Sequence, residues 1–152
     1  MSSTTITMSK GTWISSMSST PQVSSAWLRS SWYGGRMGYL KCPQAVLQFT
    51  VPSNLKYKKI NNVTLHIYIG LGTSDDRAID GTKIAPIEID SNSMDTLVYS
   101  NESTLGNPGE YQEVEPFTFN TSNTYPRWKS FDVTGLYASN LKDNTYFTVK
   151  VA

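Results

Sequence analysis

Residues 63–69 read VTLHIYI, an uninterrupted alternation of apolar and polar side chains. Successive side chains of a β-strand point to opposite faces, so a strand built from this segment has one apolar and one polar face. The apolar face carries Val63, Leu65, Ile67 and Ile69, and the polar face carries Thr64, His66 and Tyr68. A second layer has to cover the apolar row, so the segment predicts a sheet with one buried face.

The segment before it, residues 45–51, has the same period in the sequence AVLQFTV. One side of this second predicted strand carries Ala45, Leu47, Phe49 and Val51. The turn-forming residues Pro52, Ser53 and Asn54 end it. Shorter segments of similar character predict further strands at residues 6–8, 12–15, 39–42, 84–89, 96–99, 116–120, 130–133 and 146–151.

The spacers between these segments, such as GLGTSDDRAIDG and LGNPGE, are rich in the turn-forming residues Gly, Pro, Asn and Asp. One or two helical turns are expected within residues 133–141, where Leu136, Tyr137 and Leu141 share a face. Many short strands separated by turns are typical of antiparallel sandwiches. We therefore predict an all-β fold, an antiparallel jelly-roll-like β-sandwich that residues 1–152 form as a single domain.

The composition restricts the partners of such a fold. Charged residues make up only 16% of the chain and the net charge is +1, so there is no basic field for nucleic acid. No apolar run approaches the roughly 20 residues that span a bilayer, so membrane insertion is not expected. About three residues in ten are Ser, Thr or Asn, a composition common in extracellular and virion proteins. Residues 1–13 lack the pattern of a secretion signal, which favours a particle assembled in the cytoplasm.

Several segments, taken in order, are similar to one known family. They are GTWISS, WLRSSW with MGYLKC, AVLQFTVPSNL, INNVTLHIYI, WKSFDVTGLYASNL and TYFTVKV. Together they resemble the DNRLRE (disaggregatase-related) group of carbohydrate-binding-module-like domains. That family accompanies polysaccharide-active enzymes, cell-surface proteins and some phage fibre or tail proteins. The resemblance implies a jelly-roll sandwich with one further, closing strand after residues 146–151. We expect another chain or a continuation of this one to fill the sheet edge that the missing strand leaves.

An aromatic loop supplies the predicted binding residues. Trp32, Tyr33 and Arg36 lie around a Gly-Gly pair, and Tyr125 lies on a second predicted loop. Aromatic rings stack on the apolar faces of sugars, and Arg hydrogen-bonds to their hydroxyl groups. These four residues are therefore the predicted carbohydrate-binding site. The same residue types are enriched where proteins meet, so an oligomer interface is the alternative. Core or sheet-edge positions are expected instead for Trp13 and Trp128.

A second loop concentrates the carboxylates Asp75, Asp76 and Asp80. Calcium prefers several oxygen ligands in a flexible loop, so the three form a candidate structural calcium site. The loop departs from the EF-hand pattern, and Arg77 is placed to neutralise one aspartate. The alternative is an acidic turn without metal. No other cofactor is expected, because the sequence has no Cys or His cluster for zinc.

We expect no catalytic residues. The chain has a single histidine, His66, on the polar face of a predicted strand, and no flanking nucleophile motif. The sequence predicts a non-enzymatic structural and adhesion module of a virion, such as a phage fibre, tail or capsid-surface protein. Its expected partners are a glycan or cell-surface polysaccharide and other virion subunits, in a homo-oligomer. The alternatives are a carbohydrate-binding module of a bacterial secreted or cell-surface polysaccharide-degrading protein, and a purely structural subunit that binds only its neighbours.

Overall fold

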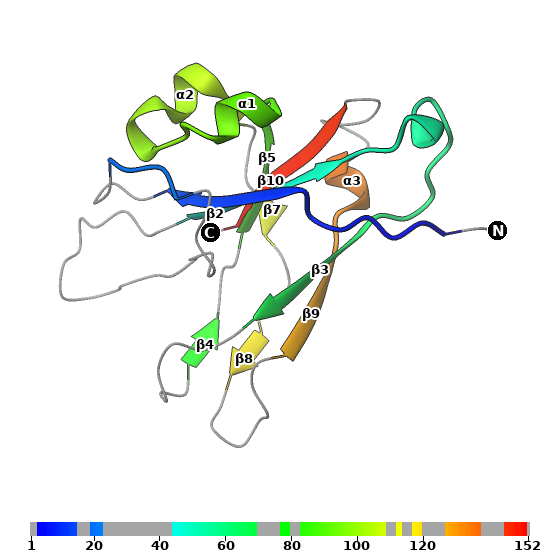
Figure 1. Ribbon diagram of the computed structural model, residues 1–152. Coiled ribbons are helices and arrows are strands. Elements are labelled where there is room, and N and C mark those ends of the chain that lie inside the picture. The colour runs from blue at the N-terminus through cyan, green and yellow to red at the C-terminus, as the bar shows by residue number, and fades with distance from the viewer. Residues whose placement is uncertain are drawn as a thin grey trace.

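The largest sheet is formed by six strands: β1 (Lys10–Ile14), β2 (Gln44–Thr50), β5 (Lys83–Glu88), β6 (Asn107–Pro108), β7 (Gln112–Glu113) and β10 (Tyr146–Val151). Its strand order is β1-β2-β10-β5-β6, with β7 also paired to β5, and every pairing is antiparallel (Figure 1). We call it the central sheet. Strand β10 lies between β2 and β5, so both of its edges are paired within the chain. The family resemblance predicted a sheet edge without a partner strand. That edge is therefore not an edge of β10.

Two further strand pairs complete the sheets. Strand β3 (Thr64–Ile69) pairs with β9 (Arg127–Asp132), and β4 (Arg77–Ile79) pairs with β8 (Phe117–Phe119), both antiparallel. This arrangement is that of a computed structural model, which describes residues 3–14, 19–22, 44–69, 77–79, 83–108, 112–113, 117–119, 127–137 and 145–151. The predicted all-β, antiparallel, sandwich-like fold is confirmed.

The main core lies between the central sheet and the β3–β9 pair. It joins residues of β2, β5, β10, β3, β9 and the short helix α3 (Thr134–Leu136). Leu65 is buried in it, and Val63 and Ile67 pack against it, while Thr64 and His66 are exposed. The alternation of residues 63–67 is thus confirmed; the side chain of Ile69 lies outside the described residues. The predicted row of β2 is also confirmed, since Ala45, Leu47, Phe49 and Val51 all contribute to this core.

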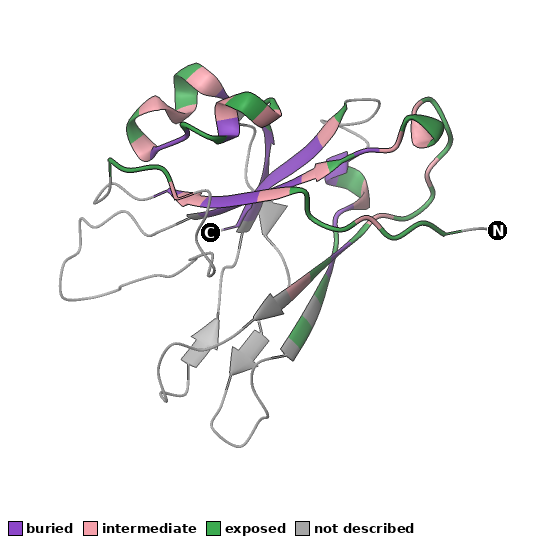
Figure 2. Ribbon diagram, viewed as in Figure 1, coloured by how far each residue is buried: buried purple, intermediate pink, exposed green. Residues whose placement is uncertain are grey.

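A second core covers the opposite face of the central sheet. Its buried residues are Ile14, Val46, Ile87, Ile89, Met94 and Leu97. The sheet residues among them are covered by a segment with three short helical turns, α1 (Ser91–Met94), η2 (Tyr99–Asn101) and α2 (Glu102–Leu105), which we call the helical cap. Figure 1 shows this cap on one side of the central sheet and β3 and β9 on the other, and Figure 2 shows the buried strands between them. The central sheet is therefore buried on both faces.

The helical cap corrects a prediction, because residues 96–99 were expected to form a strand. Asp90 caps α1 by accepting a hydrogen bond from the Ser93 N–H to its Oδ1 at 2.7 Å. The Asn101 side chain accepts from the Val98 N–H at 2.8 Å and donates to the Thr96 carbonyl at 2.9 Å. Side chains therefore satisfy the backbone groups that a strand would pair with a neighbour.

Of two further local predictions, one is wrong and one is confirmed. Residues 6–8, predicted as a strand, have no regular secondary structure. The helical turn expected after residue 133 is present as α3. In the part of the chain that the structure describes, no helix is long and apolar enough to cross a membrane.

Gly106, which ends α2, provides a test of the packing between cap and sheet. A Cβ at this position would lie 2.8 and 2.9 Å from Cδ1 and Cγ1 of Ile87, a fully buried side chain of the second core, so Ile87 or the backbone would have to shift. We expect Gly106→Ala to lower the free energy of unfolding by about 1–3 kcal/mol, measured by urea denaturation. Gly135→Ala is the matched control, because a Cβ there meets nothing within 4 Å. Equal stability of the two variants would contradict this packing.

Candidate functional site: the exposed face of β3 and β9

The outer face of the β3–β9 pair is lined by exposed polar and aromatic residues. Thr64 pairs with Asp132, His66 with Ser130, and Tyr68 with Trp128 across the two strands. The side chain of Tyr68 lies outside the described residues. The other five, Thr64, His66, Trp128, Ser130 and Asp132, are all exposed, and we call them the β3–β9 platform (Figure 2). The platform is the solvent side of the strands whose opposite side packs into the main core.

Trp128 is the largest side chain of the platform, and 65% of its surface is exposed. The expectation of a core position is corrected here, whereas a sheet-edge position agrees with the described two-stranded sheet, in which β9 pairs only with β3. The cause is strand parity, because Phe131 and Val133 are buried in the main core and Trp128 lies on the alternate face of the same strand. An exposed indole on a sheet surface is a flat apolar area beside polar groups.

Hydrogen bonds fix the polar side chains of the platform. His66 Nδ1 lies 2.7 Å from Ser130 Oγ, in a hydrogen bond whose direction depends on the imidazole tautomer. Asp132 Oδ1 accepts from the Thr134 hydroxyl at 2.7 Å and from the Thr134 N–H at 3.0 Å. These two bonds lower the pKa of Asp132 below its ordinary value of 3.8, so its carboxylate is ionised at neutral pH.

The His66–Ser130 pair has the spacing of a base and a nucleophile but lacks other parts of a catalytic site. In the described part of the chain no hydrogen bond reaches Nε2, so no third group orients the imidazole for catalysis. The neighbouring carboxylate of Asp132 is bonded to Thr134 instead. The pair is also open to water, which weakens electrostatic stabilisation of a transition state. This arrangement offers hydrogen-bonding groups for a ligand.

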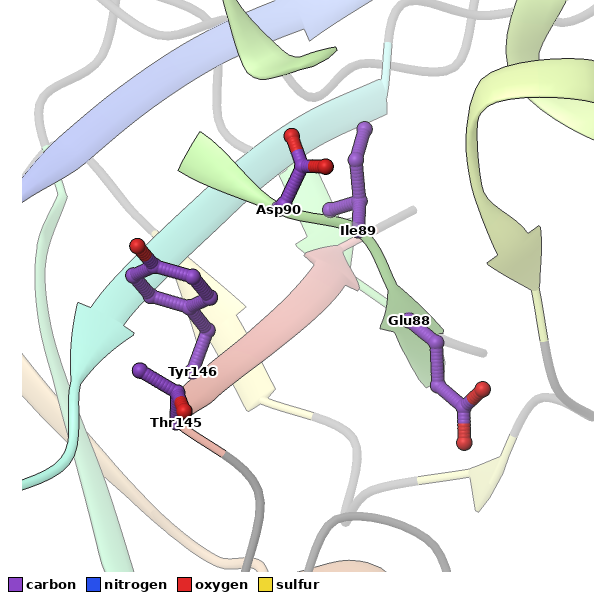
Figure 3. Close-up of a pocket in the computed structure, with 5 residues that line it drawn as sticks. All are labelled: Glu88, Ile89, Asp90, Thr145 and Tyr146. Carbon is purple, nitrogen blue, oxygen red and sulfur yellow. The ribbon is translucent and has the colours of Figure 1, made fainter. Parts of the chain in front are cut away.

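An open hollow lies where β5 separates from β10. The β5–β10 ladder ends at Pro86, which has no N–H to donate, and the following residues leave β10. The hollow is lined by Glu88, Ile89, Asp90, Thr145 and Tyr146. Figure 3 shows that the Glu88 side chain extends away from the Asp90 carboxylate and the Tyr146 ring. The two carboxylates do not converge, so the hollow does not form an acid–base pair.

Asp90 itself predicts a measurable pH dependence. Hydrogen bonds from the Ser93 backbone and side chain lower the pKa of its carboxyl group below 3.8. A carboxyl group whose pKa is lower in the folded state stabilises the fold above its unfolded pKa, and this contribution is lost as the pH falls through the folded value. We expect Asp90→Asn to lose less stability than the wild type between about pH 5 and about pH 2. Melting temperatures across this range check it, and parallel curves would contradict it.

The residues predicted from the sequence as sites are not placed by the structure. The carbohydrate-binding prediction (Trp32, Tyr33, Arg36 and Tyr125) and the calcium prediction (Asp75, Asp76 and Asp80) lie outside the described residues. Within the described ranges, no cluster of three His, Cys, Asp or Glu side chains could hold a metal ion. Both predictions therefore stay predictions, and the β3–β9 platform is a surface that the sequence analysis did not propose.

Comparison with known proteins adds no relative. No protein-family model, curated protein or solved structure matches this chain, so the resemblance to the DNRLRE group stays a prediction.

Proposed function

We propose that this protein is a non-enzymatic adhesion module that binds glycans, and that the β3–β9 platform is its binding surface. The observation that carries the proposal is the exposure of Trp128 beside the hydrogen-bonded pair of His66 and Ser130. Exposed aromatic side chains provide a large contact area together with defined geometry. A sugar ring has an apolar face of C–H groups that fits such an area, while its hydroxyl groups need donors and acceptors beside it.

The biological setting of the proposal rests on the sequence. The Ser-, Thr- and Asn-rich composition and the resemblance to carbohydrate-binding-module-like domains support a virion component, such as a phage fibre, tail or capsid-surface protein, with a jelly-roll arrangement of its strands. A carbohydrate-binding module of a bacterial secreted or cell-surface protein would use the same surface. In the virion setting we expect a homo-oligomer, which light scattering coupled to size-exclusion chromatography tests.

Trp128→Ala is the direct test of the proposed surface. Loss of ring stacking is expected to weaken glycan binding by about tenfold or more, corresponding to about 1.4 kcal/mol. Binding is measured on a glycan array and then by titration of the glycans that give a signal. Tyr57→Ala is the matched control, because Tyr57 is 83% exposed but lies in the turn between β2 and β3. Equal binding by the wild type and Trp128→Ala would reject the platform as the glycan site.

A further inference from the structure

We propose that the β3–β9 platform binds an extended, uncharged stretch of a linear polysaccharide, about three pyranose rings long, in preference to a chain end or an acidic sugar. This inference rests on the proposed glycan binding and specifies its ligand class. Three features of the platform carry it: the spacing of its side chains, the hydrogen-bonding atoms that they leave available, and its charge.

The spacing sets the length of the ligand. Trp128, Ser130 and Asp132 occupy alternate positions of β9 and therefore lie in a row along one face. At about 3.4 Å per residue, this row extends about 14 Å, enough for about three rings in line. His66 and Thr64 lie beside this row on the paired strand β3, opposite Ser130 and Asp132, respectively. All five side chains are exposed, whereas recognition of a single terminal sugar needs a concave pocket that buries most of its ligand.

Two side chains of the platform, His66 and Asp132, each have a hydrogen-bonding atom with no partner among the described residues. Ser130 holds Nδ1 of His66, and within the described residues no hydrogen bond reaches its Nε2. Both hydrogen bonds from Thr134 go to Oδ1 of Asp132, so Oδ2 is available to accept from a sugar hydroxyl. The side chains are thus already oriented, which reduces the entropy lost on binding. Sugar hydroxyl groups both donate and accept hydrogen bonds, so they can donate to Asp132 Oδ2 and can pair with His66 Nε2 in either imidazole tautomer.

Charge decides between neutral and acidic chains. Asp132 is ionised at neutral pH, and none of the five platform residues is Lys or Arg. A uronic acid, sialic acid or sulfated sugar would bring a second negative charge beside the Asp132 carboxylate, and the two like charges would repel each other. An uncharged chain meets no such repulsion.

An array of defined oligosaccharides tests the inference. The probes are glucans, mannans, xylans and galactans of one to six residues, together with oligogalacturonates of the same lengths. For at least one neutral series we expect the affinity to rise at least tenfold from one ring to three and then to level off. Oligogalacturonates are expected to bind more weakly than neutral chains of equal length. Asp132→Asn, which removes the charge and keeps the shape of the side chain, should reduce this difference.

The outcomes separate the inference from the proposed function. If single sugars bind as tightly as trisaccharides, or if acidic chains bind best, glycan binding stands and the inference is wrong. If no oligosaccharide binds the wild type, both the proposed function and the inference are wrong. If the affinity rises with chain length and Trp128→Ala binds the longer chains as tightly as the wild type does, the extended chain binds elsewhere. The assignment to the platform is then overturned.

Discussion

Replacing Glu102 by Gln is expected to lower the free energy of unfolding by about 3–5 kcal/mol. Lys150 of β10 donates a hydrogen bond from Nζ to Glu102 Oε1, and this ion pair joins the central sheet to helix α2 of the cap. The two side chains are only 6% and 12% exposed, respectively. Without the carboxylate, the buried Lys150 ammonium would lose the counter-charge that Glu102 supplies. Chemical denaturation followed by circular dichroism measures the effect.

Two comparisons isolate the buried charge as the cause. The double variant Glu102→Leu with Lys150→Met removes both charges, and we expect it to be more stable than Glu102→Gln, because apolar replacement of a whole buried pair is often neutral. Asp95→Asn breaks a second ion pair between sheet and cap among the described residues, Lys10 Nζ to Asp95 Oδ1 at 2.8 Å, whose acid is 53% exposed. Its expected cost is below about 1 kcal/mol. Equal costs for Glu102→Gln and Asp95→Asn would contradict the burial of the first pair.

Replacing Phe147 by Ala is expected to cost about 3–5 kcal/mol of stability. This ring of β10 is 7% exposed and lies in the main core between the central sheet and the β3–β9 pair. Its centroid is 5.5 Å from that of Tyr137 in an edge-to-face contact and 6.0 Å from that of Phe49. The substitution removes these contacts and leaves a cavity that the rigid sheets cannot close. Thermal and urea denaturation provide the measurement.

Trp128→Ala is the control for Phe147→Ala, since it also deletes an aromatic ring from a β-strand. Because Trp128 is 65% exposed, we expect its removal to change stability by no more than about 0.5 kcal/mol. The same variant is the one expected to lose glycan binding, so retained stability would also show that the binding loss is not caused by unfolding. A large stability loss in Trp128→Ala would mean that the β3–β9 platform is packed rather than open.

Alternation of apolar and polar residues along the sequence predicted strands well where one face is buried and the other is exposed to solvent. The apolar row of β3 follows directly from a period-two pattern. The same pattern located β2, although β2 and β10 are buried on both faces. The second core was missed because β2 is buried on both faces. Gln48 is fully buried, where its amide donates to the Ile89 carbonyl at 3.0 Å and to Thr148 Oγ1 at 3.2 Å. The buried Oε1 of Gln48 has no hydrogen-bond partner within the described residues, so only the amide nitrogen is satisfied. In sequence, such a buried polar residue has the same signal as one on the surface.

The helical cap shows a second limit of sequence patterns. Its helices have only three or four residues each, too short for a helical stripe. Their turns are stabilised by hydrogen bonds that the Asp90 and Asn101 side chains accept from backbone N–H groups. For the candidate site, by contrast, a usable signal was present. Trp128 has the opposite parity to the apolar Phe131 and Val133, so extending the predicted strand at residues 130–133 back to residue 128 would have placed its side chain on the exposed face. The site was predicted on the loops instead, because the sequence analysis gave more weight to aromatic residues in predicted loops than to those in predicted strands.

Mapping of chemical shifts by nuclear magnetic resonance tests the central claim most directly. The labelled protein is titrated with the neutral oligosaccharide that binds best on the array. We expect the largest shifts at the β3–β9 platform: Thr64, His66, Trp128, Ser130 and Asp132. Shifts concentrated instead around Trp32 to Arg36, or around the hollow at Asp90 and Tyr146, would contradict the assignment of glycan binding to this sheet face.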